Sequence, residues 1–311
     1  MQISHLGIHE SVEAVFPPER LHEALSSIDP NVAVVGDDPT EIAGCDAVVT
    51  FAHCDAFLDS GLEWIHSIQA GYDRFPLSEF EDAGITLTNS TGIHGTSVGE
   101  STLGMMLSIS RRLHAFSRQQ IDHEWDRPAW DEPFTLQHEP LCVVGLGTLG
   151  RGIAKRADGV GMHVTGVRRS PEPVPHVREV YSNDDLHEAI SEARFVALAT
   201  PLTDATEKLM GEAEFAIMRE DAYFVNVARG KCADEDALIA ALEEGEIAGA
   251  ALDVFEAEPL PENSPLWEMD GVIVTPHAAA AERDYYEHIA ELVRENVQHI
   301  DADEEITNRV V

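Results

Sequence analysis

The sequence predicts an α/β protein of two domains, each with a parallel sheet, and a cleft between them. Short apolar runs alternate with helix-length segments from one end of the chain to the other, which is typical of parallel sheets covered by helices. The 311 residues are enough for two domains, and a hydrophobic content of 44% supports packed cores.

The first group of strands is expected to end before residue 98. The apolar runs AVVTF, IHSIQA and ITLTN finish near residues 51, 70 and 89. A long apolar helix should then begin near Glu100. The proline-bearing segment 125–140 has no regular period, so we expect an extended loop there.

The second group of strands follows this loop. Further apolar runs lie at 141–147, 162–167, 195–200, 223–228, 248–254 and 272–276. The segment from Asp234 to Gly245 has the composition and length of a helix. The last helix carries an apolar stripe that is expected to fold back on the first domain, formed by Ile289, Val293, Val297 and Ile300.

Acidic residues dominate the charge. The chain has 57 Asp and Glu against 20 Lys and Arg, and a formal net charge of −37. Such a surface repels nucleic acids and anionic membranes, so neither is expected as a partner. It also repels itself, and salt near 1 M screens that repulsion because the Debye length falls to about 3 Å. We therefore predict a halophilic protein.

The cysteine pattern favours a reducing compartment. The four cysteines show no C-x-x-C spacing, and Cys142 lies in an apolar run typical of a buried thiol. The N-terminus has no basic segment followed by a long apolar stretch, and no apolar run reaches the length of a membrane span. A cytoplasmic location is predicted.

The strongest local motif is VVGLGTLGRGIA, in which Gly145, Gly147 and Gly150 fit G-x-G-x-x-G. It follows a strand and opens a helix, the context in which glycines allow a tight turn, close approach to a pyrophosphate and helix–strand packing. Thr148 and Leu149 complete the turn that would bind the phosphates at the helix N-terminus. We predict a Rossmann-like dinucleotide-binding domain.

An arginine pair indicates which dinucleotide is preferred. Arg168 lies 21 residues after Gly147, where an acid would bind the ribose 2′-hydroxyl of NAD and an arginine the 2′-phosphate of NADP. Arg169 and Ser170 offer further donors. The predicted cofactor is NADP(H), with NAD(H) accepted less well. The alternative is a solvated arginine pair bonded to surface carboxylates.

Five motifs give the chain a family resemblance. IQAGYDRF, TPLTDATEKLM, NVARG, ALDVFEAEPLP and TPHAA occur in this order over nearly the whole length. The chain resembles D-specific 2-hydroxyacid dehydrogenases, most closely the glyoxylate/hydroxypyruvate reductase-like members. The resemblance implies a substrate domain of residues 1–99 plus 284–311 and a dinucleotide-binding domain of residues 100–283. It also implies a homodimer, with the helix after Glu100 and the loop 125–140 as contacts.

The resemblance implies three catalytic residues for reducing a small 2-oxo acid. Arg229 would bind the substrate carboxylate and polarise its carbonyl, as a guanidinium does well. His277 would give the proton to the developing alkoxide. Glu258, beside His277, would favour the imidazolium form.

The resemblance also implies supporting residues. The backbone of Gly71 and Tyr72 would hold the substrate carboxylate, and Asp253 would bind the nicotinamide amide. The remaining residues expected along the cofactor are Thr200, Pro201, Thr206 and Val227.

Several alternatives remain open. A formate dehydrogenase-like enzyme shares the scaffold, although Glu258 stands where that enzyme is expected to carry glutamine. A non-enzymatic NAD(H)-sensing corepressor-like module also shares it, and a narrower alternative is glyoxylate and hydroxypyruvate reduction. Ser97 in GTSVG lies too far from a strand end for a nucleophile elbow, and is expected in a hinge before the long helix. No zinc-type spacing of histidines and cysteines occurs, so no catalytic metal is predicted.

Overall fold

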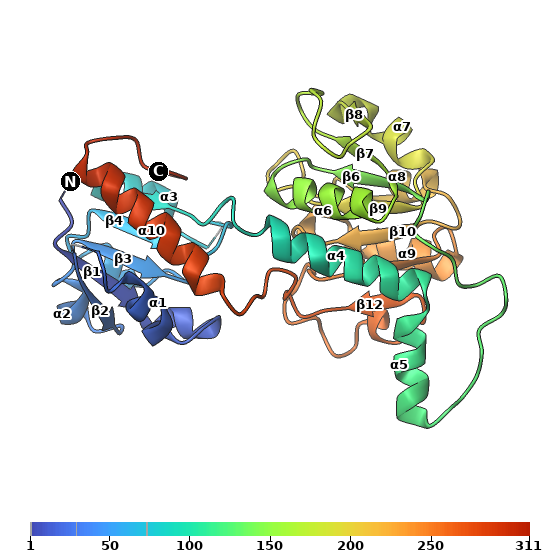
Figure 1. Ribbon diagram of the computed structural model, residues 1–311, viewed down its shortest axis with the longest axis horizontal. Coiled ribbons are helices and arrows are strands. Elements are labelled where there is room, and N and C mark those ends of the chain that lie inside the picture. Colours follow the sequence, from blue (N-terminus) through green and yellow to red (C-terminus); the bar gives the residue numbers. More distant parts are fainter. Residues whose placement is uncertain (1, 29, 73) are drawn as a thin grey trace. The chain divides into compact units, whose positions relative to one another are not determined.

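The computed structural model describes residues 2–28, 30–72 and 74–311 and confirms the α/β class. The chain divides into two compact units, Met1–Ile93 with Ala281–Val311, and His94–Ala280. Each unit contains one parallel sheet with helices packed on it (Figure 1). The borders lie a few residues before the positions 99/100 and 283/284 expected from sequence. The cleft stays a prediction.

The first unit is built on a five-stranded sheet in the order β2-β1-β3-β4-β5, with all neighbours parallel. Its strands are β1 (His5–His9), β2 (Asn31–Val35), β3 (Ala47–Thr50), β4 (Trp64–Ser67) and β5 (Thr86–Thr88). Its helices are α1 (Pro18–Leu25), α2 (Pro39–Ile42), α3 (Leu77–Ala83) and α10 (Tyr285–Asp301), with short 3₁₀ turns η1 (Glu10–Ala14) and η2 (Asp55–Phe57).

The C-terminal helix α10 completes the core of the first unit. Its apolar stripe is buried together with Leu6 and Ile8 of β1 and with Leu21 of α1. The Tyr285 hydroxyl at its start donates a hydrogen bond to the carbonyl oxygen of Ile68. Figure 1 shows α10 lying beside α1 on this unit. The stripe read from the sequence is therefore buried where α10 covers the first sheet.

The second unit is built on a seven-stranded parallel sheet in the order β12-β11-β10-β9-β6-β7-β8. Its strands are β6 (Pro140–Val144), β7 (His163–Val167), β8 (Glu179–Tyr181), β9 (Phe195–Leu198), β10 (Tyr223–Asn226), β11 (Gly249–Leu252) and β12 (Val272–Val274). Its helices are α4 (Gly95–Ser110), α5 (Leu113–Asp122), α6 (Thr148–Gly159), α7 (Leu186–Ser191), α8 (Glu212–Ile217) and α9 (Glu235–Glu244), with η3 (Asn183–Asp185), η4 (Gly230–Cys232) and η5 (Pro265–Trp267).

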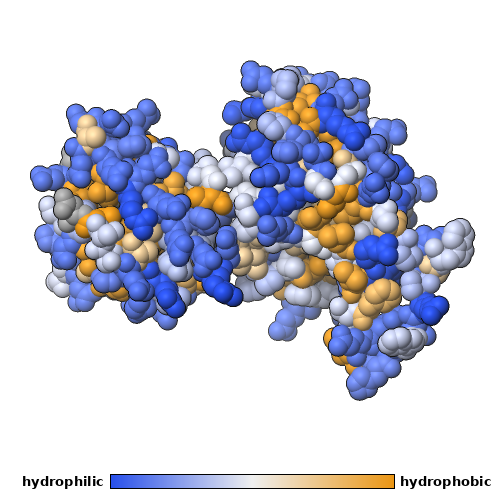
Figure 2. Space-filling model, in the orientation of Figure 1, coloured by the Kyte–Doolittle hydropathy of each residue, from blue (hydrophilic) through white to orange (hydrophobic). Residues whose placement is uncertain are grey.

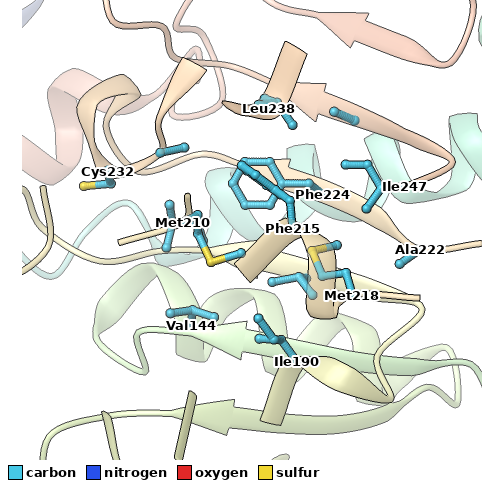
Figure 3. Packing of buried hydrophobic residues seen from close by; sticks show 14 of the residues in the cluster. Val144, Ile190, Met210, Phe215, Met218, Ala222, Phe224, Cys232, Leu238 and Ile247 are labelled. Atoms are coloured by element: carbon cyan, nitrogen blue, oxygen red, sulfur yellow. The ribbon is translucent and has the colours of Figure 1, made fainter. Parts of the chain in front are cut away.

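One face of this sheet buries a large apolar cluster. Figure 3 shows Phe215 of α8 packed against Phe224 of β10, with Met218 and Ile190 nearby. The ring centroids of Phe215 and Phe224 lie 5.3 Å apart in an edge-to-face arrangement, which adds to the stabilisation from burial alone. This core fixes the strand ends from which the site residues project.

The segment GTSVG does not form the expected hinge. Helix α4 begins at Gly95, so Ser97 lies inside its first turn. An added Cβ at Gly152 of α6 would lie 1.8 Å from the carbonyl oxygen of Gly95, and one at Gly99 would lie 2.6 Å from that of Gly152. Glycines thus allow α4 to pack closely on α6, which places α4 in the second unit and moves the border before residue 94.

The molecular surface is strongly polar. Figure 2 shows a face covered mostly by hydrophilic residues in each unit, with apolar residues in separate patches. Among the described residues, no helix combines the length and apolar character needed to cross a bilayer.

The charge of −37 leads to a stability prediction. Raising KCl from about 0.1 M to multimolar concentration should raise Tm by on the order of 10 °C, because the Debye length falls from about 10 Å to about 3 Å or less. Circular dichroism melts over a KCl series measure this, with a neutral solute at equal osmolality as the control. A Tm that stays flat in KCl contradicts the halophilic assignment.

Candidate functional site

The glycine turn lies between β6 and α6 and has the backbone that the motif requires. Gly145 has φ +100°, a left-handed conformation that side chains other than glycine rarely adopt. An added Cβ at Gly150 would lie 1.8 Å from the carbonyl oxygen of Gly145, so only glycine allows this packing of helix on strand. Gly147 caps α6, and nothing lies within 4 Å of the place where its Cβ would be. A pyrophosphate could approach the backbone there.

A cavity of about 410 Å³ opens at this turn. It brings together eight of the residues predicted to bind the cofactor: Gly145, Gly147, Arg168, Arg169, Ser170, Thr200, Pro201 and Thr206. Thr148, Leu149 and Gly150 do not line it, but they form the first turn of α6, whose N–H groups have no partner within the helix. Val227 is buried at 5% exposure and does not line the cavity.

The two arginines follow β7 and reach this cavity. Arg168 is half-buried, and its backbone N–H donates to the carbonyl oxygen of Tyr181, which fixes the strand end. In residues 2–28, 30–72 and 74–311, no carboxylate forms an ion pair with the guanidinium of Arg168 or Arg169. In a chain with 57 acids this disfavours the alternative of arginines bonded to surface carboxylates.

Arg229 follows β10 in a tightly held turn. The buried Asn226 side chain donates to the carbonyl oxygen of Arg229 at 3.2 Å and accepts from the N–H of Ala228 at 3.1 Å. An added Cβ at Gly230 would lie 1.9 Å from the carbonyl of Phe255. Glycine at position 230 therefore packs the Arg229 turn against the segment that leads to Glu258.

His277 and Glu258 form a direct pair. His277 Nδ1 lies 2.8 Å from Glu258 Oε2. The other carboxylate oxygen, Glu258 Oε1, accepts a hydrogen bond from the N–H of Phe255 at 3.2 Å. The side chains are 38% and 32% exposed, so the pair remains accessible. Because a carboxylate accepts but cannot donate, Nδ1 carries a proton, and Nε2 is the nitrogen left for a substrate.

Asp253 is buried at 2% exposure and bonded to the loop that carries His277. Its Oδ1 accepts from the Thr275 hydroxyl at 2.6 Å and from the N–H of Ala278 at 2.8 Å, and its Oδ2 accepts from the N–H of Ala279 at 2.9 Å. His277 itself has φ +51°, an uncommon conformation for a residue other than glycine. These bonds hold the histidine backbone in place and use three acceptor positions of the carboxylate that is expected to bind nicotinamide.

Gly71 and Tyr72 belong to the first unit, whereas Arg229, Glu258 and His277 belong to the second. Both follow β4, and the preceding residue Ala70 accepts a hydrogen bond at 2.7 Å from the side chain of Asn89. Tyr72 is 44% exposed. The segment is thus anchored by its neighbours and presents an exposed tyrosine.

The cavity also has lining residues that the sequence reasoning missed. Asn183 and Leu186 follow β8, a three-residue edge strand with too little apolar character to be recognised. Thr203, Ala205 and Leu209 also line the cavity. The Thr206 hydroxyl donates a hydrogen bond to the carbonyl oxygen of Pro201 at 2.6 Å and accepts one from the N–H of Thr203. These bonds hold together the segment from Pro201 to Thr206 that lines the cavity.

The free thiol nearest to Arg229 in sequence is Cys232, which is fully buried. Burial raises the pKa of this thiol, so it remains protonated at neutral pH and is a poor nucleophile. Cys232 is therefore set aside as a candidate nucleophile of this region.

Comparison with known families gives one match. A model described as D-isomer specific 2-hydroxyacid dehydrogenase, NAD binding domain, matches residues 103–279. Glyoxylate reductase of Korarchaeum cryptofilum is 35% identical over 235 residues, which cover 73% of this chain and 69% of that protein.

Solved structures of similar fold cover nearly the whole chain. A D-isomer specific 2-hydroxyacid dehydrogenase family protein from Aeromonas salmonicida superposes with a TM-score of 0.84 at 26% identity, covering 99% of each chain. A D-isomer specific 2-hydroxyacid dehydrogenase from Xanthobacter autotrophicus, solved with NADPH and MES, gives a TM-score of 0.81 at 30% identity, covering 99% of this chain and 98% of that one.

Proposed function

The chain belongs to the D-isomer specific 2-hydroxyacid dehydrogenase family, and from this premise we propose that it is an NADPH-preferring reductase with His277 as proton donor. It is an NAD(P)-dependent oxidoreductase that reduces small 2-oxo acids to D-2-hydroxy acids. The contact between His277 and Glu258 carries the catalytic part of the proposal, because it orients the one nitrogen that can give a proton.

The proposed mechanism uses three side chains of the second unit. Arg229 binds the substrate carboxylate and polarises the neighbouring carbonyl. The nicotinamide cofactor, when bound, supplies the hydride. His277 donates the Nε2 proton to the carbonyl oxygen as negative charge develops there, and Glu258 stabilises the imidazolium through Nδ1. The backbone of Gly71 and Tyr72 is proposed to hold the carboxylate from the first unit.

The residues that line the cavity support the proposal of a phosphorylated dinucleotide as cofactor. The open backbone at Gly147 and the first turn of α6 would hold the pyrophosphate, and the guanidinium groups of Arg168 and Arg169 would hold a 2′-phosphate. The relative from Xanthobacter autotrophicus was solved with NADPH, which supports the proposal that NADPH binds here. NAD(H) is proposed as a weaker cofactor.

Glyoxylate and hydroxypyruvate are the first substrates to test, since the archaeal relative is named a glyoxylate reductase. Loss of absorbance at 340 nm, with NADPH and a series of 2-oxo acids in multimolar KCl, measures turnover. Turnover of at least one 2-oxo acid is expected. No turnover with any of them favours the NAD(H)-sensing module, and formate oxidation favours the formate dehydrogenase-like alternative.

Asp253 is proposed to position His277 rather than to touch the cofactor. Asp253→Asn replaces one acceptor oxygen by an NH₂ group facing backbone N–H donors, so we expect kcat to fall about 10- to 100-fold. KM for NADPH should stay within a factor of about 2. Asp234→Asn, which alters the cap of α9 in the same unit, is the control and should leave kcat unchanged. A selective rise in KM for NADPH would instead support the nicotinamide role.

A homodimer is proposed through α5 and the loop after it. Helix α5 has no buried residue, and Trp125 and Trp130 are 95% and 93% exposed. Figure 1 shows α5 extending away from the rest of its own unit. Large exposed apolar side chains of this kind mark interaction surfaces.

The double variant Trp125→Ser/Trp130→Ser should shift the protein from dimer to monomer, because it removes the two largest apolar groups of this surface. Light scattering after gel filtration in high KCl measures the mass. Val34→Ser, at an exposed position of the first unit, is the control and should stay dimeric. A wild-type monomer, or a double variant that remains dimeric, contradicts the proposed interface.

A cytoplasmic location is proposed from the free cysteines. Cys142 and Cys232 are fully buried, and Cys45 and Cys54 are half-buried, all as free thiols. Thiol counting on the native and unfolded protein purified without reductant checks this, and four free thiols are expected after unfolding.

A further inference from the structure

Three side chains with metal-binding chemistry meet in the first unit, outside the residues assigned above. His9 ends β1, Asp37 follows β2 and Cys54 follows β3. These strands are parallel neighbours in the order β2-β1-β3, so their carboxyl ends share one edge of the sheet. A histidine nitrogen, a carboxylate oxygen and the sulfur all lie within 4.8 Å of one another.

The buried histidine points into this cluster. His9 is 4% exposed, and its Nδ1 accepts the backbone N–H of Ser11 at 3.3 Å, which leaves Nε2 for the other two residues. Nε2 lies 3.0 Å from Asp37 Oδ1, but this is a close approach rather than a directed hydrogen bond. Within the described residues Nε2 has no hydrogen-bond partner. A buried polar atom in this state is unfavourable unless another ligand satisfies it.

The Asp37 carboxylate places a negative charge beside the buried imidazole of His9. Carboxylate oxygen, imidazole nitrogen and cysteine sulfur are the three kinds of ligand that zinc takes in proteins.

We propose that His9, Asp37 and Cys54 bind one divalent cation of the zinc class. Zn²⁺ takes imidazole nitrogen, thiolate and carboxylate at about 2.0–2.3 Å, with tetrahedral ligands roughly 3.3–3.8 Å apart. His9 Nε2 and Asp37 Oδ1 are already 3.0 Å apart, so only the separations to the sulfur, which lie within 4.8 Å, need to close, by about 1 Å. Asp37 is exposed and Cys54 half-buried, each in a loop that can make this movement. The thiolate selects Zn²⁺ or Co²⁺ over Mg²⁺ and Ca²⁺, and water completes the fourth position.

Binding displaces protons within the cluster. The Cys54 thiol loses its proton to solvent, and the imidazole proton moves from Nε2 to Nδ1, which ends the weak contact with the Ser11 N–H. One long hydrogen bond is exchanged for three metal–ligand bonds. The ion then ties together the loops after β1, β2 and β3, which are three neighbouring strands of the sheet.

Titration with Co²⁺ tests the site directly and does not depend on enzymatic activity. The full-length reduced protein is stripped with a chelator, transferred to multimolar KCl and titrated with Co²⁺ alone. We expect a thiolate-to-cobalt charge-transfer band in the near ultraviolet that saturates at one equivalent. Zn²⁺ should bleach it by displacement, and Mg²⁺ should not. A titration without this band overturns the proposal.

Matched variants separate the site from weak binding to the acidic surface. Cys54→Ser should abolish the band, and Asp37→Asn and His9→Gln should weaken Co²⁺ binding at least about 10-fold. Cys45→Ser removes another half-buried free thiol of this unit, and Asp55→Asn removes an exposed neighbouring acid, so both should bind as the wild type does. A band that survives Cys54→Ser, or that falls equally in Cys45→Ser, overturns the assignment. If circular dichroism shows that His9→Gln does not fold, the variants Cys54→Ser and Asp37→Asn, at more exposed positions, test the proposal without it.

Discussion

His277→Gln should lower kcat for 2-oxo acid reduction by about 10²- to 10⁴-fold, the usual contribution of a positioned general acid. Glutamine is close to histidine in size and can still bond Glu258, but it cannot give a proton. KM for NADPH should change little, because His277 does not line the cavity that contains the glycine turn and the two arginines. Steady-state kinetics in multimolar KCl measures both parameters.

A second histidine–glutamate pair provides the control. His187 Nε2 lies 2.8 Å from Glu214 Oε1 in the same unit, with 54% and 19% exposure. His187→Gln removes an equally close pair and should leave kcat unchanged. Equal losses for His187→Gln and His277→Gln would mean that such pairs matter for folding, and would remove His277 from the mechanism.

The role of Glu258 follows from the same geometry. Glu258→Gln retains an oxygen that can accept from Nδ1 but removes the charge that stabilises the imidazolium. Reduction by this variant should therefore have a lower kcat, while KM for NADPH changes little. Circular dichroism of the variant distinguishes a charge effect from a loss of structure.

The fold class could be predicted from the sequence because strands buried in the sheets appear as short apolar runs. The nine apolar runs correspond to strands β3 to β7 and β9 to β12, since strands buried on both faces are continuously apolar. Strands β1 and β2 were both missed. The sequence of β1, HLGIH, alternates histidine and glycine with apolar residues, whereas β2, NVAVV, was missed although it is an apolar run. Strand β8 was missed because it is a three-residue edge strand with a glutamate. Ser97 was expected in a hinge because the glycines of GTSVG suggested a flexible segment. These glycines instead allow α4 to pack closely on α6, a contact that cannot be predicted from the sequence of α4 alone.

The candidate site could be predicted only in part, for a related reason. The glycine turn and the arginine pair are set by spacing along one βα unit, and the structure brings them to one cavity. The contact between His277 and Glu258 joins residues 19 apart, and only the family resemblance suggested it. The three hydrogen bonds from the histidine loop to the Asp253 carboxylate arise from tertiary contacts that the sequence does not show, and the contact of Asp253 with nicotinamide stays a prediction. His9, Asp37 and Cys54 were not grouped because parallel strand order, rather than spacing, brings them together.

Arg168→Ala combined with Arg169→Ala should raise KM for NADPH by at least about 10²-fold and leave KM for NADH nearly unchanged. Each hydrogen bond to a charged phosphate contributes about 1.5–3 kcal/mol, and tenfold corresponds to about 1.4 kcal/mol, so losing two such bonds gives this factor. NADH has no 2′-phosphate and uses the glycine turn, which the variant leaves intact. Initial rates with each cofactor at constant high KCl measure the two KM values.

The single variants and one control sharpen this result. If both guanidinium groups bind the phosphate, Arg168→Ala and Arg169→Ala should each account for part of the loss; if only the half-buried Arg168 does, Arg169→Ala should behave as the wild type. Arg178→Ala removes an exposed arginine just before β8, outside the cavity, and should change neither KM. A loss that is equal for NADPH and NADH would show that the arginines support the fold of this region or the shared pyrophosphate. The acidic surface repels phosphate, and salt screens long-range attraction. Only direct contacts can therefore produce an effect that is selective for NADPH over NADH. The cavity provides the side chains of Arg168 and Arg169 as candidates for such contacts.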